Sequence, residues 1–114
     1  MLAASQLTEF RQRLEKEQNT LLAQTATRLT ELGVANKVIY ALRQQGLDGI
    51  QQYVDALHDR QLHGLTERLG RVEAALCQLD LGLFGLCADC ESEIPPRLLD
   101  SDPTTQRCND CQSG

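Results

Sequence analysis

Two Cys-x-x-Cys pairs near the C-terminus restrict the possible folds of this chain more than any other feature. Cys87 and Cys90 form the first pair, Cys108 and Cys111 form the second, and seventeen residues separate the two pairs. Each pair can present two sulfurs on one side of a tight turn, so two pairs complete the tetrahedral coordination of a single ion at Zn–S distances of about 2.3 Å. Four protein ligands leave no open coordination position, which predicts one structural zinc ion, Zn²⁺, and not a catalytic one.

The segment around these cysteines is expected to need such an ion. Residues 84–114 are too few to bury a self-sufficient apolar core, whereas a structural zinc ion supplies roughly 10–16 kcal/mol of apparent binding free energy in small fingers. Four apolar side chains are expected to pack beside the ion: Leu86, Ile94, Leu98 and Leu99. Two disulfides or a redox-active dithiol are the alternatives, but neither explains two equal pairs in a chain without the pattern of a secretory signal.

The fifth cysteine and the two histidines are interpreted as structural or surface residues. Cys77 lies between Leu76 and Leu79 of an apolar helical seam, so we expect a partly buried, inert thiol. His58 and His63 are five residues apart and cannot share the face of one helix as a pair of metal ligands would. We expect both imidazoles at the surface.

The residues before the cysteines favour two long helices. No proline occurs before Pro95, and apolar residues recur mostly three, four or seven positions apart, which is the helical period. We expect one helix over residues 2–45, with a weak point at Gly33. A second helix is expected over residues 48–83, because its leucine seam keeps a heptad spacing for three heptads.

Two glycines flank Asp48 in the segment 46–49, a pattern typical of a tight turn. The two helices are therefore expected to fold back on each other. The sequence predicts a mainly α protein with a long antiparallel helical hairpin, or coiled coil, over residues 1–83 and its tip near 46–49. A small four-Cys zinc finger follows over residues 84–114. A hairpin that only stabilises itself, or that pairs with a second copy, is the alternative for the helical part.

Charge and composition argue against several classes of protein. Eleven basic and sixteen acidic side chains give a formal net charge of −5, and aromatic residues make up only 4% of the chain. Such a chain lacks the basic face and the stacking platform of a nucleic-acid-binding protein. No apolar run approaches the ~20 residues of a membrane span, and no nucleophile elbow or phosphate-binding loop indicates an enzyme. We therefore expect a cytoplasmic protein that is not an enzyme.

The cysteine segment resembles the DksA/TraR family of bacterial transcription regulators. The family pattern is an aromatic-Gly-x-Cys-x-x-Cys entry, then an Ile, an Arg-Leu pair, a Pro and a closing Cys-x-x-Cys. Here the matching residues are Phe84, Gly85, Cys87, Cys90, Ile94, Arg97, Leu98, Pro103, Cys108 and Cys111. The specific match covers roughly residues 69–112, and the hairpin matches in length and layout.

The resemblance implies a mode of action. Family members insert the helical hairpin into the secondary channel of RNA polymerase, where its tip approaches the active centre and modulates transcription initiation. The finger and the base of the hairpin rest on the channel rim. The resemblance thus implies a monomer that binds RNA polymerase and makes no direct sequence-specific contact with DNA.

Departures from the family pattern change these expectations at the hairpin tip. Family tips usually carry two aspartates three residues apart, whereas Asp48 is the only acid in the turn 46–49. Asp55 and Asp59 lie about two turns below and are interpreted as a solvated helix face. Binding to polymerase is therefore a firmer expectation than the usual effect on promoters.

Further departures concern guanosine tetraphosphate, the alarmone of the stringent response. DksA-type members respond to it through basic side chains near the hairpin base and the finger. Arg71 stands at one of these positions, as a possible alarmone or rim contact, but Asp102 and Gln112 stand at the other two. A carboxylate beside a phosphate is unfavourable, so we expect little or no alarmone dependence. Glu91 replaces a glycine of the first cysteine turn, where we expect strain.

Two other functions are compatible with a zinc-stapled hairpin. The first is a protein–protein interaction module that docks on a different partner. The second is a nucleic-acid-binding zinc finger, which the acidic charge disfavours.

Overall fold

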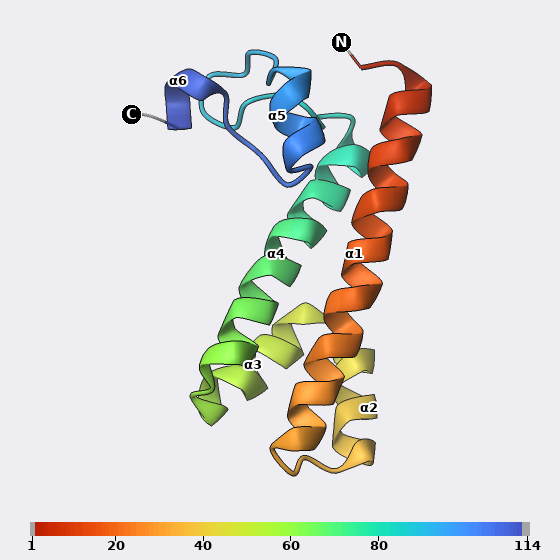
Figure 1. The fold of residues 1–114 in the computed structure, drawn as a ribbon, viewed down its shortest axis with the longest axis vertical. Helices are drawn as coiled ribbons and strands as arrows, with labels where there is room; N and C mark the ends of the chain where they lie inside the picture. Colours follow the sequence, from red (N-terminus) through yellow and green to blue (C-terminus); the bar gives the residue numbers. More distant parts are fainter. Residues whose placement is uncertain (1, 113–114) are drawn as a thin grey trace. The chain divides into compact units, whose positions relative to one another are not determined.

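The computed structural model describes residues 2–112 and is built from helices (Figure 1). In chain order these helices are α1 (Ala4–Glu31), α2 (Asn36–Gln45), α3 (Leu47–Leu57), α4 (Arg60–Leu81), α5 (Pro96–Ser101) and α6 (Asn109–Gln112). The mainly α prediction is confirmed: the described residues hold no strand, and a single isolated bridge pairs Leu86 with Glu93. Residues 1 and 113–114, at the ends of the predicted hairpin and finger, lie outside the described part. Within it, no helix is both long and apolar enough to cross a bilayer.

The chain divides into two compact units. We call residues 18–70 the helical unit, and residues 2–17 together with residues 71–112 the cysteine unit. This division differs from the predicted boundary between residues 83 and 84. The reason is that residues 4–17 of α1 and residues 71–81 of α4 group with the cysteine segment. Helices α1 and α4 therefore contribute residues to both units.

The first predicted helix is interrupted, so the prediction of one helix over residues 2–45 is wrong. Gly33 adopts a φ of +87° just after the end of α1. Its N–H donates to the Thr30 carbonyl, and the N–H of Val34 donates to the Leu29 carbonyl, each at 3.0 Å. This pair of bonds is the Schellman motif, which satisfies the last carbonyls of a helix. Val34 also packs against the apolar cluster that contains Leu29, so the glycine ends the helix instead of weakening it.

The second predicted helix, over residues 48–83, is also interrupted. His58 adopts a left-handed φ of 52° directly after α3. The next residue, Asp59, accepts a hydrogen bond from the N–H of Leu62 at 3.0 Å. A side-chain oxygen that binds the third amide of a helix is an N-cap. Asp59 therefore starts a new helix, α4, where the sequence predicted continuation.

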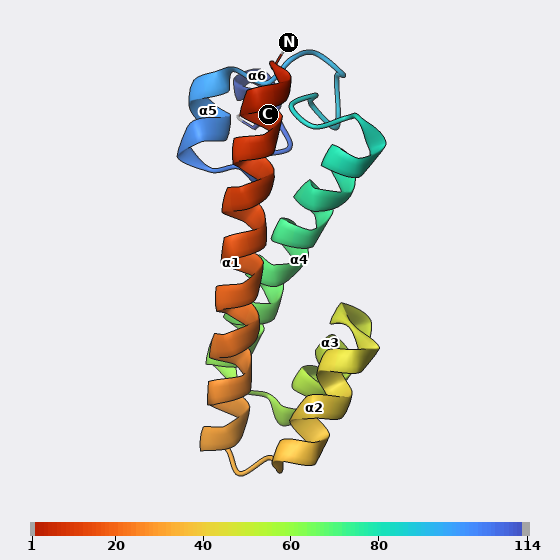
Figure 2. The ribbon, with the colours of Figure 1, turned by 90° about the vertical axis from the view of Figure 1, so that its right-hand side faces the viewer.

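The turn at 46–49 does not form the end of the α1/α4 hairpin, and the predicted tip is wrong. This turn joins α2 and α3, which pack against each other in the helical unit (Figure 2). Leu47 approaches α4 at Gly70, where its Cδ2 lies 3.8 Å from the position of an added Cβ. Gly70 is ten residues beyond the start of α4, or about 15 Å along the helix. In the helical unit, the paired α1 and α4 instead end at residues 32–35 and 58–59.

The core of the helical unit contains side chains from all four of its helices. Its buried members are Leu29, Ile39, Leu42, Ile50, Val54 and Leu62. Two threonines are also buried: Thr25 donates its hydroxyl to the Leu21 carbonyl at 2.7 Å, and Thr66 donates to the Leu62 carbonyl at 3.0 Å. A threonine that returns its hydroxyl to the preceding helical turn can be buried without an unsatisfied polar atom. These two threonines are therefore compatible with close packing of α1 and α4 in this unit.

Candidate metal centre

The four predicted ligands lie together in the cysteine unit. The sulfurs of Cys87, Cys90, Cys108 and Cys111 all lie within 4.8 Å of one another, and all four residues are free thiols. The Sγ atoms of Cys90 and Cys108 are 3.6 Å apart, well beyond the ~2.05 Å of a disulfide bond. The spacing of the pairs thus correctly identified a four-sulfur cluster.

The first pair sits on a turn that its own backbone closes. The N–H of Glu91 donates to the Cys87 carbonyl at 3.0 Å, and the N–H of Cys87 donates to the Ser92 carbonyl at 2.8 Å. Glu91 adopts a φ of +63°, a left-handed conformation that costs an ordinary residue about 1–2 kcal/mol relative to glycine. The strain expected at Glu91 is therefore present. The turn directs both sulfurs toward the second pair.

The second pair is positioned by α6. Cys108 immediately precedes this helix, Cys111 lies within it, and the N–H of Gln112 donates to the Cys108 carbonyl at 3.0 Å. The two cysteine segments are linked by a hydrogen bond from the N–H of Ala88 to the Gln106 carbonyl at 2.7 Å. This backbone contact holds the two turns against each other.

Local hydrogen bonds and the close approach of the sulfurs give the thiols different pKa values. Backbone amides of Cys108 and Cys90 point at the Cys87 sulfur and lower the pKa of that thiol to about 6, even though it is buried. The Ser92 hydroxyl, 2.8 Å from the Cys90 sulfur, lowers the pKa of Cys90. The pKa of Cys111 is raised because it must ionise beside Cys87 and the other sulfurs. A bound cation would remove this repulsion and favour four thiolates.

The geometry and the donor chemistry fit a metal ion. A tetrahedral ion with bonds of about 2.3 Å to sulfur places the sulfurs about 3.8 Å apart. The 3.6 Å separation of the Cys90 and Cys108 sulfurs and the 4.8 Å limit for the whole set agree with this value. Four thiols form a set of soft donors. With all four engaged, an ion would keep no position for substrate or water.

An apolar cluster from both ends of the chain supports the site. Cys87 and Cys108 are buried with Phe10, Ile94 and Leu99. Sequence analysis expected Ile94 and Leu99 at this place, but it missed Phe10, which is contributed by α1. Phe10 was detectable only as one apolar position of a helix, because nothing in its neighbourhood indicates the partner against which that helix packs.

The N-terminal part of α1 is attached to the cysteine segment by aromatic and polar contacts. The rings of Phe10 and Phe84 lie 5.3 Å apart, centroid to centroid, a distance typical of favourable aromatic pairs. The guanidinium of Arg13 lies 5.6 Å from the centre of the Phe10 ring. It also donates to the Asp100 carbonyl at 2.8 Å. A further ion pair, at 3.0 Å, joins Arg11 of α1 to Asp80 of α4.

The other sequence-predicted site residues do not join the metal centre. Asp48 is exposed in the first turn of α3, and Arg71 is exposed on α4. Cys77 is exposed and not partly buried as expected, because the buried face of α4 there passes through Val72 and Ala75. Both histidines are exposed as predicted.

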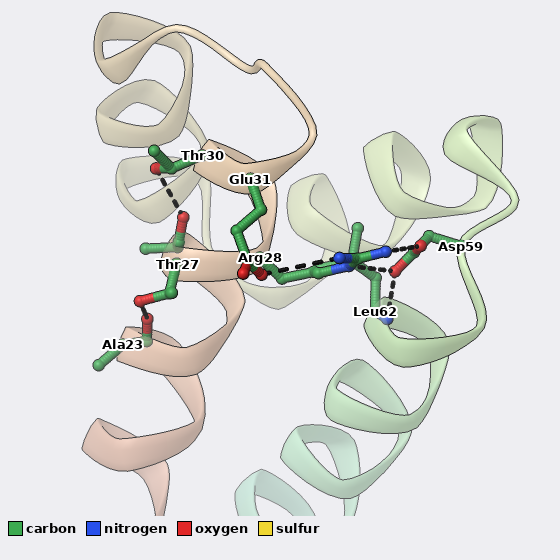
Figure 3. Close-up of polar contacts among 8 residues, drawn as sticks. Ala23, Thr27, Arg28, Thr30, Glu31, Asp59 and Leu62 are labelled. Carbon is green, nitrogen blue, oxygen red and sulfur yellow. Dashed lines mark hydrogen bonds and ion pairs between the residues drawn. The ribbon is translucent and has the colours of Figure 1, made fainter.

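A second polar site, which sequence analysis missed, lies in the helical unit (Figure 3). The Arg28 guanidinium donates to both carboxylate oxygens of Asp59, at 2.7 and 3.1 Å. The hydrogen bonds from Arg28, together with that from the Leu62 amide, lower the pKa of Asp59 to about 2. Asp59 is therefore a cap and ion-pair partner and does not belong to the solvated face, shared with Asp55, that the sequence predicted.

Comparison with known proteins adds no assignment to these sites. No protein-family model matches the chain, and a search of curated proteins found no similar one.

Proposed function

We propose that the four cysteines hold one structural Zn²⁺ ion and that the protein is a transcription regulator that binds RNA polymerase. The helical hairpin would enter the secondary channel of the enzyme and modulate initiation. The observation that carries this proposal is the attachment of the N-terminal part of α1 to the four-cysteine segment through Phe10 and Phe84. Phe84 belongs to the Phe-Gly-x-Cys-x-x-Cys entry on which the resemblance to the DksA/TraR family rests.

Zinc is the ion that best suits this set of donors. Four thiolates in a tetrahedral arrangement favour Zn²⁺ or an iron–sulfur centre over hard cations such as Mg²⁺ and Ca²⁺. The ion would supply a four-way crosslink and no bond-making chemistry, because all of its positions are taken by protein sulfurs. We therefore propose that the protein acts by binding and not by catalysis.

The length of the paired helices suits entry into a channel. Helix α1 has 28 residues, or about 42 Å of length, and in the helical unit it shares one core with α2, α3 and α4. In the helical unit the hairpin ends at residues 32–35 and 58–59, so these residues, and not Asp48, would lead into the channel. The ion pair between Arg28 and Asp59 would hold this end together during insertion.

The surroundings of two other positions support weak dependence on guanosine tetraphosphate. Asp102 accepts hydrogen bonds from the amide and hydroxyl of Thr104, at 3.0 and 2.8 Å. The Gln112 side-chain amide donates to the Arg107 carbonyl at 2.8 Å. Neither side chain is a cation, so Arg71 alone would face the alarmone phosphates.

Binding to core RNA polymerase tests the proposal directly. We expect the zinc-loaded protein to co-elute with the enzyme and to be displaced by another secondary-channel protein. Cys108→Ser should lose zinc and binding together, whereas Cys77→Ser, which changes an exposed thiol outside the cluster, should retain both. A zinc-loaded protein that ignores polymerase would contradict the proposal and favour an interaction module for a different partner.

Transcription in vitro then tests the regulatory part. On a stable-RNA promoter, we expect the protein to change the yield of initiated transcripts by a similar factor with and without guanosine tetraphosphate. A large stimulation by the alarmone would contradict the weak dependence that Asp102 and Gln112 imply.

A further inference from the structure

One side of α2 carries an exposed aromatic ring between two cations. Tyr40 is 67% exposed, and Lys37 and Arg43, three residues before and after it, are exposed as well. Side chains three residues apart are neighbours on a helix surface, so we call these three residues the basic–aromatic face. Ile39 and Leu42 of the same helix are buried in the core of the helical unit. The core is therefore filled without Tyr40.

The positive charge of the basic–aromatic face is not neutralised by the residues that the structure describes. Lys37 and Arg43 form no ion pair with any of them. The acidic residues nearest to this face in the sequence are Glu31 and Asp48. Glu31 pairs with Arg28 at 3.7 Å, and Asp48 pairs with no cation of the described part. The face is therefore a local positive site on a chain whose formal net charge is −5.

The ring of Tyr40 has no partner among residues 2–112. Its hydroxyl forms no hydrogen bond with these residues, and its ring makes no aromatic or cation–π contact with them. The other tyrosine of the chain, Tyr53, packs against the core of the helical unit. An exposed aromatic ring beside cations is the arrangement on which proteins stack the bases of a single nucleotide strand.

The order of cation, ring and cation matches a nucleotide strand, in which a phosphate lies on each side of every base. Lys37 and Arg43 are six residues apart, or about 9 Å along the helix axis, and both side chains are long. We propose that the basic–aromatic face binds single-stranded nucleic acid, with a base stacked on Tyr40 and the neighbouring phosphates paired with the two cations. An acidic protein segment would pair with the cations but leave the ring unused, and a duplex covers its base faces by stacking.

This inference goes beyond the proposed function and does not depend on binding to polymerase. The composition of the whole chain hides the basic–aromatic face, because sixteen acidic side chains outnumber eleven basic ones. Stacking accepts every base, so the expected binding has no sequence preference.

Fluorescence anisotropy with labelled oligonucleotides of about 12 residues tests the proposal on the full chain without polymerase. We expect oligouridine and oligothymidine to bind more tightly than a duplex of the same length, and the tighter of the two single strands identifies RNA or DNA as the preferred ligand. The logarithm of the affinity should fall with the logarithm of the salt concentration with a slope of about −1.4, because two phosphates are paired. Absence of saturable binding of either strand at ~0.02 M salt would overturn the inference and leave the proposed function intact.

Matched variants separate a defined site from a general effect of charge. Tyr40→Ala should weaken binding about tenfold, whereas Tyr40→Phe, which keeps the ring, should stay within about twofold of the wild type. Lys37→Gln should reduce the salt slope by about 0.7. Arg97→Gln removes an equal charge from an exposed position of the cysteine unit and should leave the slope unchanged. Equal effects of Lys37→Gln and Arg97→Gln would overturn the inference.

Tyrosine fluorescence tests the stacked base itself. Tyr53→Phe leaves Tyr40 as the only tyrosine, and a base stacked on its ring quenches its emission. We expect oligothymidine to reduce the emission of this variant and not that of Tyr40→Phe, in which only Tyr53 emits. Unchanged emission from Tyr40 at saturating oligothymidine, or equal quenching in the two variants, would overturn the inference.

Discussion

Asp59 combines two roles in one carboxylate. It caps α4 through the Leu62 amide and receives both arms of the Arg28 guanidinium. Its side chain is only 14% exposed, so solvent screens this pair less than an ordinary surface pair. The arrangement fixes the junction of α3 and α4 at the end of the helical unit.

The lowered pKa of Asp59 predicts an acid-dependent loss of stability. Because the pKa falls from 3.8 to about 2 on folding, the pair stabilises the folded state fully above pH 4. That stabilisation disappears as the pH falls from about 4 to about 2. Asp59→Asn keeps a capping side chain but cannot form the ion pair, so its melting temperature should lie a few degrees lower near neutral pH. The difference between the two proteins should shrink toward pH 2.

Thermal unfolding of the wild type and of Asp59→Asn between pH 7 and pH 2 measures the difference in melting temperature. Other groups that take up protons affect both proteins equally, so their contribution cancels when one melting temperature is subtracted from the other. A difference that stays constant down to pH 2 would contradict the assigned role of Asp59.

The Arg28–Asp59 pair could not be predicted from the sequence. Its members are 31 residues apart, and Asp59 becomes a cap only because the helix breaks at His58.

Glu91 is a residue whose backbone conformation suits glycine better. Glu91→Gly should stabilise the cysteine unit by about 0.5–1 kcal/mol, because relief of the left-handed strain exceeds the extra entropy that glycine loses on folding. Glu91→Ala should give no such gain, since alanine keeps the strain. Competition with a chelator measures how tightly the wild type, Glu91→Gly and Glu91→Ala retain zinc. Equal improvement of zinc retention in the two variants would show that the effect does not come from the backbone conformation.

At the scale of the elements, the helix breaks account for most of the difference between the predicted and the observed fold. From Leu29 through Leu32 and Ile39 to Leu42 the apolar residues keep helical spacings of three, seven and three. Periodicity alone therefore does not reveal that the helix ends. Gly33 was recognised only as a weak point, because the sequence does not show whether a glycine continues a helix or takes a positive φ. The four-cysteine cluster was easier to predict, because the spacing of its residues follows from the chemistry of one ion.

Two glycine substitutions test the helix ends. Gly33→Ala should destabilise the helical unit by about 1–2 kcal/mol, since alanine resists a φ of +87°. Gly64→Ala, inside α4 where an added Cβ meets nothing within 4 Å, should stabilise by about 0.5–1 kcal/mol. Chemical denaturation of the two variants provides the comparison. If Gly33→Ala is as stable as Gly64→Ala, α1 does not end at this glycine.

The contact between α1 and the cysteine segment predicts coupling of a helix to the metal. Phe10 is 8% exposed, so Phe10→Ala should cost about 3 kcal/mol and weaken zinc retention against a chelator. Phe10→Leu should lose less than half as much. Unchanged zinc retention in the alanine variant would show that the metal centre is independent of α1.

At the scale of the whole molecule, the two compact units do not follow the division of the chain into hairpin and finger. The cysteine unit combines residues from both ends of the sequence, whereas the helical unit has its own core without cysteines. The helical hairpin and the cysteine cluster were predictable from local patterns. The assignment of Phe10 to the cysteine unit was not, because it depends on contacts between distant segments.

Complex formation with core RNA polymerase, measured by sedimentation with and without prior removal of zinc, tests the central claim most directly. We predict that the zinc-loaded protein forms a complex of one chain per enzyme and that the chelated protein forms none until zinc is restored. Sedimentation of the zinc-loaded protein apart from the polymerase would contradict the account.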